Sequence, residues 1–425
     1  MGSEGDQESG ITRRGGGLSS WRYNSSLVQV ILMGMVCFCT IGMIRAISGM
    51  GGGGQVDPTA ANNANTALYA TFSVAGVLSG GLYNVLGPRV MLPAACSSCL
   101  LFTGSFLYYN HFQSQVFLVV AGVVGGVGAG MLWAVQGAVM TSYPPPHRKG
   151  MYISLFWVIF SSGGVVGGMI PFFLNFHRQV DSVNDATYIG FMGFMAAVIR
   201  DDGSQCTLTN HSKPSTEAIE ILKLFKNWKM LLLAPAAWAS NFFYAYEFNN
   251  VNAAQFNLRT RGLNNVSYWA AQMLGSIAIG YVFDLGFLTR KRRGFLGIGT
   301  ISLIGTAICY GLFDAVFQSM IYWVIGALAD DSETLSRYVG FYKGLQSAGA
   351  AVAWQLDTRK VPMLTQLIVN WALTTVSYPL LTILVALAVR DELVEGEELK
   401  TYKGSNLTSN GDTGFADDDV IKETN

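Results

Sequence analysis

Two acidic residues lie deep inside apolar stretches of this sequence. Glu247 follows the apolar run that starts at Met230, and Asp314 is the only formally charged residue between positions 294 and 329. A charged side chain inside a bilayer is costly, so it usually faces a cavity or a partner. A lone buried carboxylate would otherwise need a proton or a cation. We therefore predict that both carboxylates face a polar cavity, where either one could carry a coupling proton.

Further polar side chains accompany these acids at helical spacing. Asp314, Gln318 and Tyr322 are four residues apart, so they share one face of a helix. The full set of candidates for a solute or ion cavity is Glu247, Asn250, Asn252, Asp314, Gln318, Gln136, Lys343 and Arg45. Three of them have a second interpretation. Arg45 and Lys343 could extend along the bilayer to its surface, and Gln136 could serve helix packing.

The sequence contains no signature of another kind of chemistry. Its four histidines lie in loops or at the ends of apolar segments, and none pairs with an acid at metal-ligand spacing. It has no glycine-rich phosphate loop and no nucleophile–base set. The formal net charge of zero does not favour a nucleic-acid partner. We therefore predict no catalytic site, no metal, no cofactor and no enzyme activity.

The elements that must hold the polar residues are membrane-spanning helices. Hydrophobic residues make up 51% of the chain and charged residues only 13%, about half the charged share of a soluble domain. The hydrophobic residues come in blocks of about 20, the length that crosses a hydrocarbon core of ~30 Å. This pattern predicts an all-α, multi-pass protein of the lipid bilayer. The predicted spans are 27–47, 64–86, 90–109, 115–139, 151–174, 187–199, 230–257, 266–288, 294–312, 313–329, 336–356 and 363–389.

Two places in this list are irregular. Span 187–199 is short for a crossing and needs help from its neighbours. Spans 294–312 and 313–329 follow one another with no obvious loop. We keep all twelve, because this count places most loop Lys and Arg residues, including the run 290–293, on one side, as the positive-inside rule requires. Both chain termini are then cytosolic, in a membrane that the sequence does not identify.

The long middle connection suggests two six-helix halves. We predict a disordered cytosolic N-terminus at 1–26, a helical bundle at 27–199 and a cytosolic loop between the halves at 200–229. A second bundle at 230–389 and an acidic cytosolic tail at 390–425 complete the chain. Glycines repeat at every fourth position within spans, for example Gly122, Gly126 and Gly130, which predicts close helix packing.

Two smaller expectations concern the outer ends of the spans. The run Gly51–Gly54 predicts a flexible extracellular turn. Span 230–257 is expected to end near Gln255, so that 257–265 (NLRTRGLNN) forms an outside loop before the next helix.

A short motif occurs once in each half. Gly80-x-x-x-Asn84-x-x-Gly87-Pro88-Arg89 follows the second span, and Gly280-x-x-x-Asp284 followed by a basic run from Arg290 comes after the eighth. Both resemble the loop signature of the major facilitator superfamily, in which an acid and arginines clamp a cytosolic loop and bias a gate. Asn84 departs from that signature by replacing the acid. The predicted gating residues are Gly80, Asn84, Gly87, Arg89, Gly280, Asp284 and Arg290, and the alternative is that they are ordinary helix ends with positive charge.

Three longer stretches carry a closer resemblance. They are 130–168 (GMLWAVQGAVMTSYPPPHRKG…), 243–265 (FYAYEFNNVNAAQFNLRTRGLNN) and 311–331 (GLFDAVFQSMIYWVIGALADD). They resemble the uncoordinated-93-like branch of the superfamily, in its fungal form, over nearly all of residues 20–390. The resemblance implies secondary transport of a small, unidentified solute by alternating access. The alternative that it leaves open is a non-transporting regulator or trafficking partner of another membrane protein.

Overall fold

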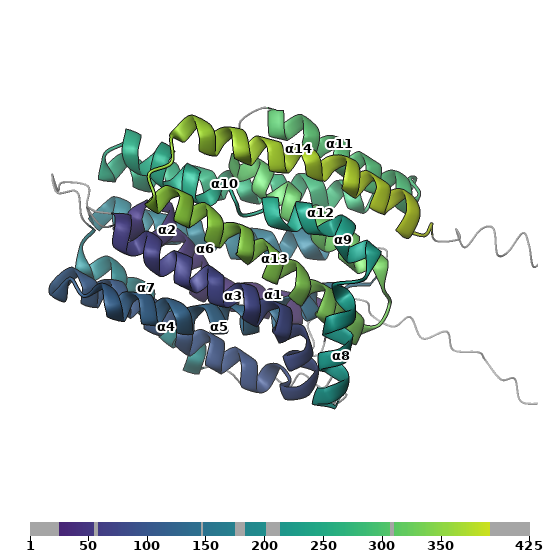
Figure 1. The fold of residues 1–425 in the computed structure, drawn as a ribbon, viewed down its shortest axis with the longest axis horizontal. Coiled ribbons are helices and arrows are strands. Elements are labelled where there is room, and N and C mark those ends of the chain that lie inside the picture. The colour runs from purple at the N-terminus through teal and green to yellow at the C-terminus, as the bar shows by residue number, and fades with distance from the viewer. Residues whose placement is uncertain are drawn as a thin grey trace, which may run out of the picture.

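The chain folds into a bundle of long helices that run roughly along one direction (Figure 1). The structure, a computed structural model, describes residues 25–54, 58–145, 148–174, 183–200, 213–306 and 310–391. The first half contains α1 (Ser26–Cys37), the π-helical turn η1 (Phe38–Gly42), α2 (Met43–Gly49), the short turn η2 (Gly52–Gly54), α3 (Pro58–Leu86), α4 (Pro88–Phe112), α5 (Gln115–Ser142), α6 (Lys149–Leu174) and α7 (Asp185–Arg200).

A short helix, α8 (Pro214–Leu224), leads to the second half and lies across one end of the bundle (Figure 1). The second half contains α9 (Trp228–Ala239), the π-helical segment η4 (Tyr246–Ala253), α10 (Leu258–Phe283), α11 (Arg290–Thr306), α12 (Tyr310–Leu328), α13 (Ser332–Thr358) and α14 (Met363–Ala388). If α1–η1–α2 and α9–η4 each count as one segment, six described segments precede α8 and six follow it.

The outer face of this bundle suits a bilayer. Among the described residues, seven helical segments are long and apolar enough to cross one, namely Ser26–Gly49, α4, α5, α6, α10, α12 and α14. Large apolar side chains such as Val116, Leu274 and Leu387 are exposed on these helices, where lipid rather than water would cover them. The all-α, multi-pass fold predicted from composition is confirmed, and its helices embed it in lipid.

The structure corrects the boundary between the two crowded spans. α11 ends at Thr306 and α12 begins at Tyr310, so the predicted boundary between residues 312 and 313 is wrong and lies inside α12. Residues 307–309 lie outside the described chain. The nearby Gly311 does not mark a turn. It lies within α12 and packs against the backbone of Tyr268. α7 has 16 residues, about 24 Å at 1.5 Å per residue, in line with a short sixth span.

At the predicted outer ends of the spans, the helix that follows η4 ends at Gln255 as expected, whereas the loop predicted at 257–265 is corrected. The Asn257 side chain accepts a hydrogen bond from the Thr260 amide at 2.9 Å, which caps α10 and starts it at Leu258. The predicted loop 257–265 is therefore mostly helix. Gly51–Gly54 is a buried turn, not a flexible exposed one. All four glycines have positive φ angles, which glycine adopts without strain, and the Tyr188 hydroxyl donates to the Gly53 carbonyl at 2.7 Å.

The predicted terminal segments mostly lie outside the described chain. Residues 1–24 and 392–425 are not described, nor are 201–212 within the predicted loop between the halves. The domain bounds and the cytosolic placement of the termini therefore stay predictions.

Glycines bring the helices into close contact, within and between the halves. A Cβ added to Gly126 on α5 would lie 2.3 Å from the Leu68 carbonyl oxygen on α3. Between the halves, a Cβ on Gly76 of α3 would lie 2.9 Å from the Gly344 backbone nitrogen on α13. Such distances are impossible for a real Cβ, so only glycine permits these contacts. α3 with α13, and α6 with α10, form the main seams between the two halves.

We expect Gly126→Ala to destabilise the protein by about 1–3 kcal/mol, because the new methyl group must push the α3 and α5 backbones apart. Unfolding of the purified protein in detergent measures the change. Gly193→Ala in α7 is the matched control, since nothing lies within 4 Å of its added Cβ and alanine favours a helix. Equal stability of the two variants would contradict this account of the packing.

Candidate functional site

A broken helix contributes several side chains to the centre of the bundle. α9 ends at Ala239, the chain turns through residues 240–243, and helix resumes before η4. The turn frees side-chain and backbone polar groups that only protein groups or water can satisfy at membrane depth. Gln346 of α13 satisfies two of these side-chain groups, since its amide donates to the Ser240 hydroxyl at 2.7 Å and to the Asn241 side-chain oxygen at 3.0 Å.

Asp314 is a fully buried carboxylate held by four side-chain hydrogen bonds. It accepts from the hydroxyls of Tyr244 (2.7 Å) and Tyr268 (3.1 Å), and from the amides of Gln272 (2.5 Å) and Gln318 (2.6 Å). No described Lys or Arg forms a salt bridge with it, although Arg45 attracts it at longer range. Four donors occupy both of its oxygens and tie α10, α12 and the α9 break together.

Lys343 lies in the same cluster without a carboxylate of its own. Its ammonium donates to the side-chain oxygens of Gln346 (2.8 Å) and Gln318 (3.3 Å) and lies 4.0 Å from the centre of the Trp133 ring. Gln318 therefore connects the two charges, because its amide donates to Asp314 while its oxygen accepts from Lys343. Only 2% of Lys343 is exposed, so its side chain ends inside the bundle.

Arg45 is also buried inside the bundle. Its guanidinium carbon lies 4.6 Å from the centre of the Phe160 ring and 5.1 Å from that of Trp269. The π-helical turn η1 immediately precedes α2, the helix that carries Arg45, and π turns of this kind recur at functional sites. In the described part of the chain, the Nη1 atom of Arg45 has no hydrogen-bond partner.

Gln136 joins the cluster from α5. Its oxygen accepts a hydrogen bond of 2.6 Å from the Tyr322 hydroxyl of α12, so it connects the two halves. Its side-chain nitrogen has no partner among the described residues. The residue therefore does more than fill space between helices.

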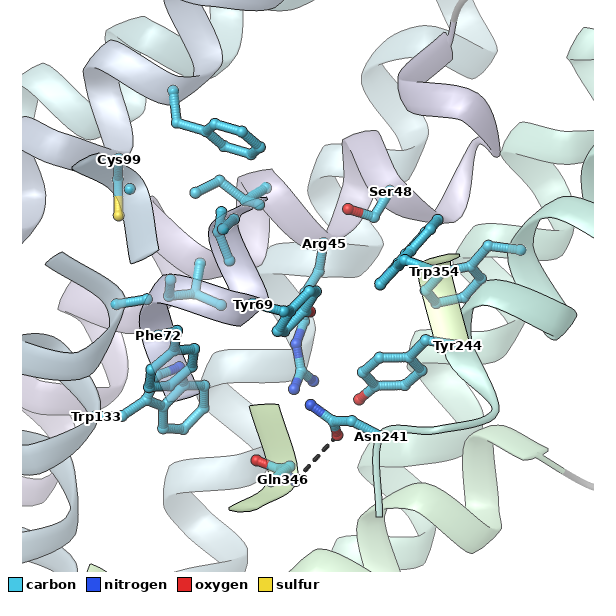
Figure 2. Close-up of a pocket in the computed structure, with 17 residues that line it drawn as sticks. Arg45, Ser48, Tyr69, Phe72, Cys99, Trp133, Asn241, Tyr244, Gln346 and Trp354 are labelled. Atoms are coloured by element: carbon cyan, nitrogen blue, oxygen red, sulfur yellow. Dashed lines mark hydrogen bonds between the residues drawn. The ribbon is translucent and has the colours of Figure 1, made fainter. Parts of the chain in front are cut away.

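A cavity opens beside this cluster (Figure 2). The volume in which the centre of a water molecule can lie is about 60 Å³. Arg45, Tyr69, Asn241, Tyr244 and Gln346 line its polar side, and its apolar side includes Leu68, Phe72, Phe102, Trp133 and Trp354. Asp314, Gln318 and Lys343 lie behind this wall, bonded to the residues that form it.

Glu247 faces a different cavity. That space has a volume of about 240 Å³ and is more open than the first, with Asn252, Tyr268 and Tyr310 among its walls. Glu247 and Asp314 therefore do not share one cavity. Tyr268 connects them, because it lines the Glu247 cavity and donates its hydroxyl proton to Asp314.

Asn250 and Asn252 lie toward the end of the bundle opposite α8 and do not line the central cavity. Asn250 donates to Asp357 at 2.8 Å, and Asn252 donates to the Gly49 carbonyl at 2.7 Å. Asn62 of α3 and Asn249 of η4 donate to the other oxygen of Asp357, at 2.8 and 2.7 Å. We call Asn62, Asn249, Asn250 and Asp357 the outer latch, because they join the halves at this end.

Sequence comparison places the chain in a family. The Major Facilitator Superfamily model matches residues 30–358. The chain is 59% identical to UNC93-like protein 1 of Arabidopsis thaliana over 426 residues, which cover 88% of this chain and 93% of that protein. This chain is a UNC93-like member of the major facilitator superfamily. A UNC93-like protein of Schizosaccharomyces pombe is 36% identical, over 86% of this chain and 84% of its own.

The predicted family is thus confirmed, while its fungal form stays a prediction because the plant proteins match at higher identity. Membership agrees with the prediction that the chain is not an enzyme. Among solved structures, the E. coli fucose:proton symporter superposes with a TM-score of 0.62 at 11% identity, covering 86% of this chain and 98% of that chain. At that identity the likeness shows the fold alone.

In this UNC93-like protein, predicted gating residues of the second half bond to backbone groups. Asp284 accepts from the backbone amides of Gly150 (2.8 Å) and Met151 (2.6 Å) at the start of α6. Gly280 packs tightly against Gly150. Arg290 donates to the Gly326 carbonyl at 3.4 Å. Asp284 therefore joins the two halves by capping a helix.

In the first copy of the motif, Asn84 stands where the superfamily signature has an acidic residue. Glu217 of α8 provides a carboxylate beside it. Arg337 of α13 donates to both Glu217 oxygens, at 2.8 and 2.7 Å. Asn84 donates to Glu217 at 3.2 Å and accepts from the Ser336 hydroxyl at 3.0 Å. We call Asn84, Glu217, Ser336 and Arg337 the inner latch. Gly80 lets α3 approach the Ser336–Arg337 backbone, Gly87 has a φ of 70°, and Arg89 is exposed.

Sequence reasoning missed Glu217, Asn249 and Asp357. Glu217 and Asp357 lie in predicted loops, where a charged residue needs no partner, and Asn249 lies inside the predicted span 230–257. One signal was available for Glu217: it follows Pro214, a residue favoured in the first turn of a helix, so a helix with a partner for its acid could have been expected there.

We expect Glu217→Gln to destabilise the protein by about 2–3 kcal/mol, because the buried Arg337 guanidinium loses its bidentate carboxylate and keeps only the 3.4 Å contact with Glu333. Unfolding in detergent measures this change. Glu220→Gln is the control, since Glu220 pairs with Lys223 on the exposed side of α8 and such pairs contribute about 0–1 kcal/mol. Equal losses in both variants would show that Arg337 does not depend on Glu217.

Proposed function

We propose that this protein is a secondary transporter that couples the movement of a small solute to a proton by alternating access. The observation that carries the proposal is the chain Asp314–Gln318–Lys343, buried at the meeting of the two halves beside a cavity. A charge at this depth is expensive to maintain and typically marks a pathway for a substrate or an ion.

The two latches support the alternating-access part of the proposal. The inner latch joins α3, α8 and α13 at one end, and the outer latch joins α3, η4 and α13 at the other. Each latch joins the two halves at its own end of the bundle. Opening one latch at a time would admit solute from one side only, by rocking of the halves about the glycine seams.

The side-chain chemistry supports Asp314 as the proton site. Two of its four partners are tyrosine hydroxyls, which can turn from donating to accepting once the carboxyl group carries a proton. Tyr268 also borders the Glu247 cavity. A proton arriving at Glu247 would pass through water in that cavity to the Tyr268 hydroxyl, which donates its own proton to Asp314. Gln318 would pass the change in charge on to Lys343 by altering its hydrogen bonds.

The sidedness of this scheme follows the positive-inside rule. Lys223, Lys226 and Lys229 lie in or just after α8, so we assign the inner latch to the cytosol, with both termini on that side. The Glu247 cavity then opens to the outside.

Proton flux into liposomes tests the proposal. The protein is reconstituted with an internal pH dye, an inward proton gradient is applied, and pools of sugars, amino acids and small organic acids are added in turn. We expect at least one pool to accelerate acidification over that in empty liposomes. Asp314→Asn should reduce this flux about tenfold or more, which corresponds to ~1.4 kcal/mol, while Glu247→Gln should slow it less.

Asp330→Asn is the control, because it removes a carboxylate of the short connection between α12 and α13. Undiminished proton flux in Asp314→Asn would remove Asp314 from the coupling mechanism. If no pool moved protons, transport coupled to protons would be wrong, and the non-transporting role as a partner of another membrane protein would be favoured.

A further inference from the structure

The central cavity contains a cation whose hydrogen bonds are incomplete. Arg45 is 9% exposed, and its Nη1 atom has no partner in the described part of the chain. Its neighbours are aromatic rings at 4.6 to 5.8 Å, which attract a cation but accept no strong hydrogen bond. A buried charged donor without an acceptor is costly, so this position favours a ligand that supplies one.

A second donor points toward the same place. The side-chain oxygen of Asn241 accepts from Gln346 at 3.0 Å and from Gln318 at 3.4 Å. This bonding turns the Asn241 nitrogen toward the Arg45 guanidinium (Figure 2). Two nitrogen donors that face each other need an acceptor between them. Tyr69 also lines the cavity here, and its hydroxyl has no hydrogen-bond partner among the described residues.

The charges around the cavity leave one positive charge in excess. Arg45 is the only charged residue among those that line it. Behind the wall, Asp314 and Lys343 have opposite charges, linked through Gln318. In their ionised forms the three residues therefore carry a net charge of +1, which one anionic group would neutralise.

The rest of the wall selects a particular kind of anion. Phe72, Phe102, Trp133 and Trp354 form an apolar surface with Leu68 across from the donors. An inorganic anion would leave this surface without contacts. A cavity of about 60 Å³ by water centres holds about four to six waters at ~10–15 Å³ each, comparable in bulk to a small aromatic acid.

We propose that the central cavity binds a small organic monoanion, with its carboxylate on Arg45, Asn241 and Tyr69 and its apolar body against Phe72, Trp133 and Trp354. The inference rests on the proposed function only in that it names the solute class of the same site. Binding can be measured without transport, so the two can fail separately.

Benzoate is the test probe, with benzamide and benzylamine as neutral and cationic molecules of similar shape. Each is titrated into the purified full-length protein in lipid nanodiscs, and tryptophan fluorescence reports binding because Trp133 and Trp354 line the cavity. We expect saturable binding of benzoate, at least tenfold weaker binding of benzamide and none of benzylamine. Equal binding of benzoate and benzamide would overturn the proposal, as would complete competition by chloride or phosphate at equal concentration.

Two variants locate the site. Arg45→Gln should abolish benzoate binding. Asn241→Asp provides a variant that should still fold, because its new carboxylate pairs with Arg45 and occupies the position proposed for the anion. It should also abolish benzoate binding, with the thermal stability of the protein maintained. Ser302→Ala in α11, outside the residues that line the cavity, should bind benzoate like the unmodified protein. Unchanged benzoate binding in Asn241→Asp would overturn the assignment.

The proton-flux experiment separates this inference from the proposed function. Proton flux driven by a neutral solute, with no benzoate binding, would overturn the inference and leave the transporter in place. Benzoate binding with no proton flux from any pool would support the anion site and remove proton-coupled transport.

Discussion

The carboxylate of Asp314 imposes the strongest constraint on this fold. At the depth of a bilayer, an isolated carboxylate would be many kcal/mol less stable than in water. The chain meets this cost with four side-chain donors from three places, which are the α9 break, α10 and α12. None of those segments can move far without breaking a bond to the carboxylate. Asp314 therefore organises the second half of the protein.

The broken helix and the π-helical turns are consequences of the same polar centre. If α9 continued as a regular helix through Ser240 and Asn241, its backbone groups would all be hydrogen-bonded within the helix. The turn at 240–243 instead lets Gln346 bind both side chains, while Tyr244 reaches Asp314. On the other side, η1 precedes the helix that carries Arg45. Irregular backbone is tolerated here because protein groups, not lipid, surround it.

Glycine seams and polar latches have complementary roles between the halves. Gly76 and Gly344 bring α3 and α13 into backbone contact, and such contacts carry no directional bonds. The latches at either end carry charges and hydrogen bonds, whose partners lie on different elements. A contact of small residues can slide or rock at little cost, whereas a bidentate Glu217–Arg337 pair is either made or broken. That combination suits a protein with a small number of discrete states.

The sequence by itself determined the membrane class, the order of the helices, the glycine contacts and most of the central polar residues, because each depends on residue type and local spacing. It did not determine which side chains meet. Asp314 and Lys343 are 29 positions apart yet share Gln318, while Glu247 faces a cavity of its own. Glu217 and Asp357 were assigned to loops, since their partners lie over 100 residues away. Only the tertiary structure decides such pairs. The free-energy cost of burying a charge depends on how deeply it is buried and on partners that are distant in sequence, and the helical period determines neither.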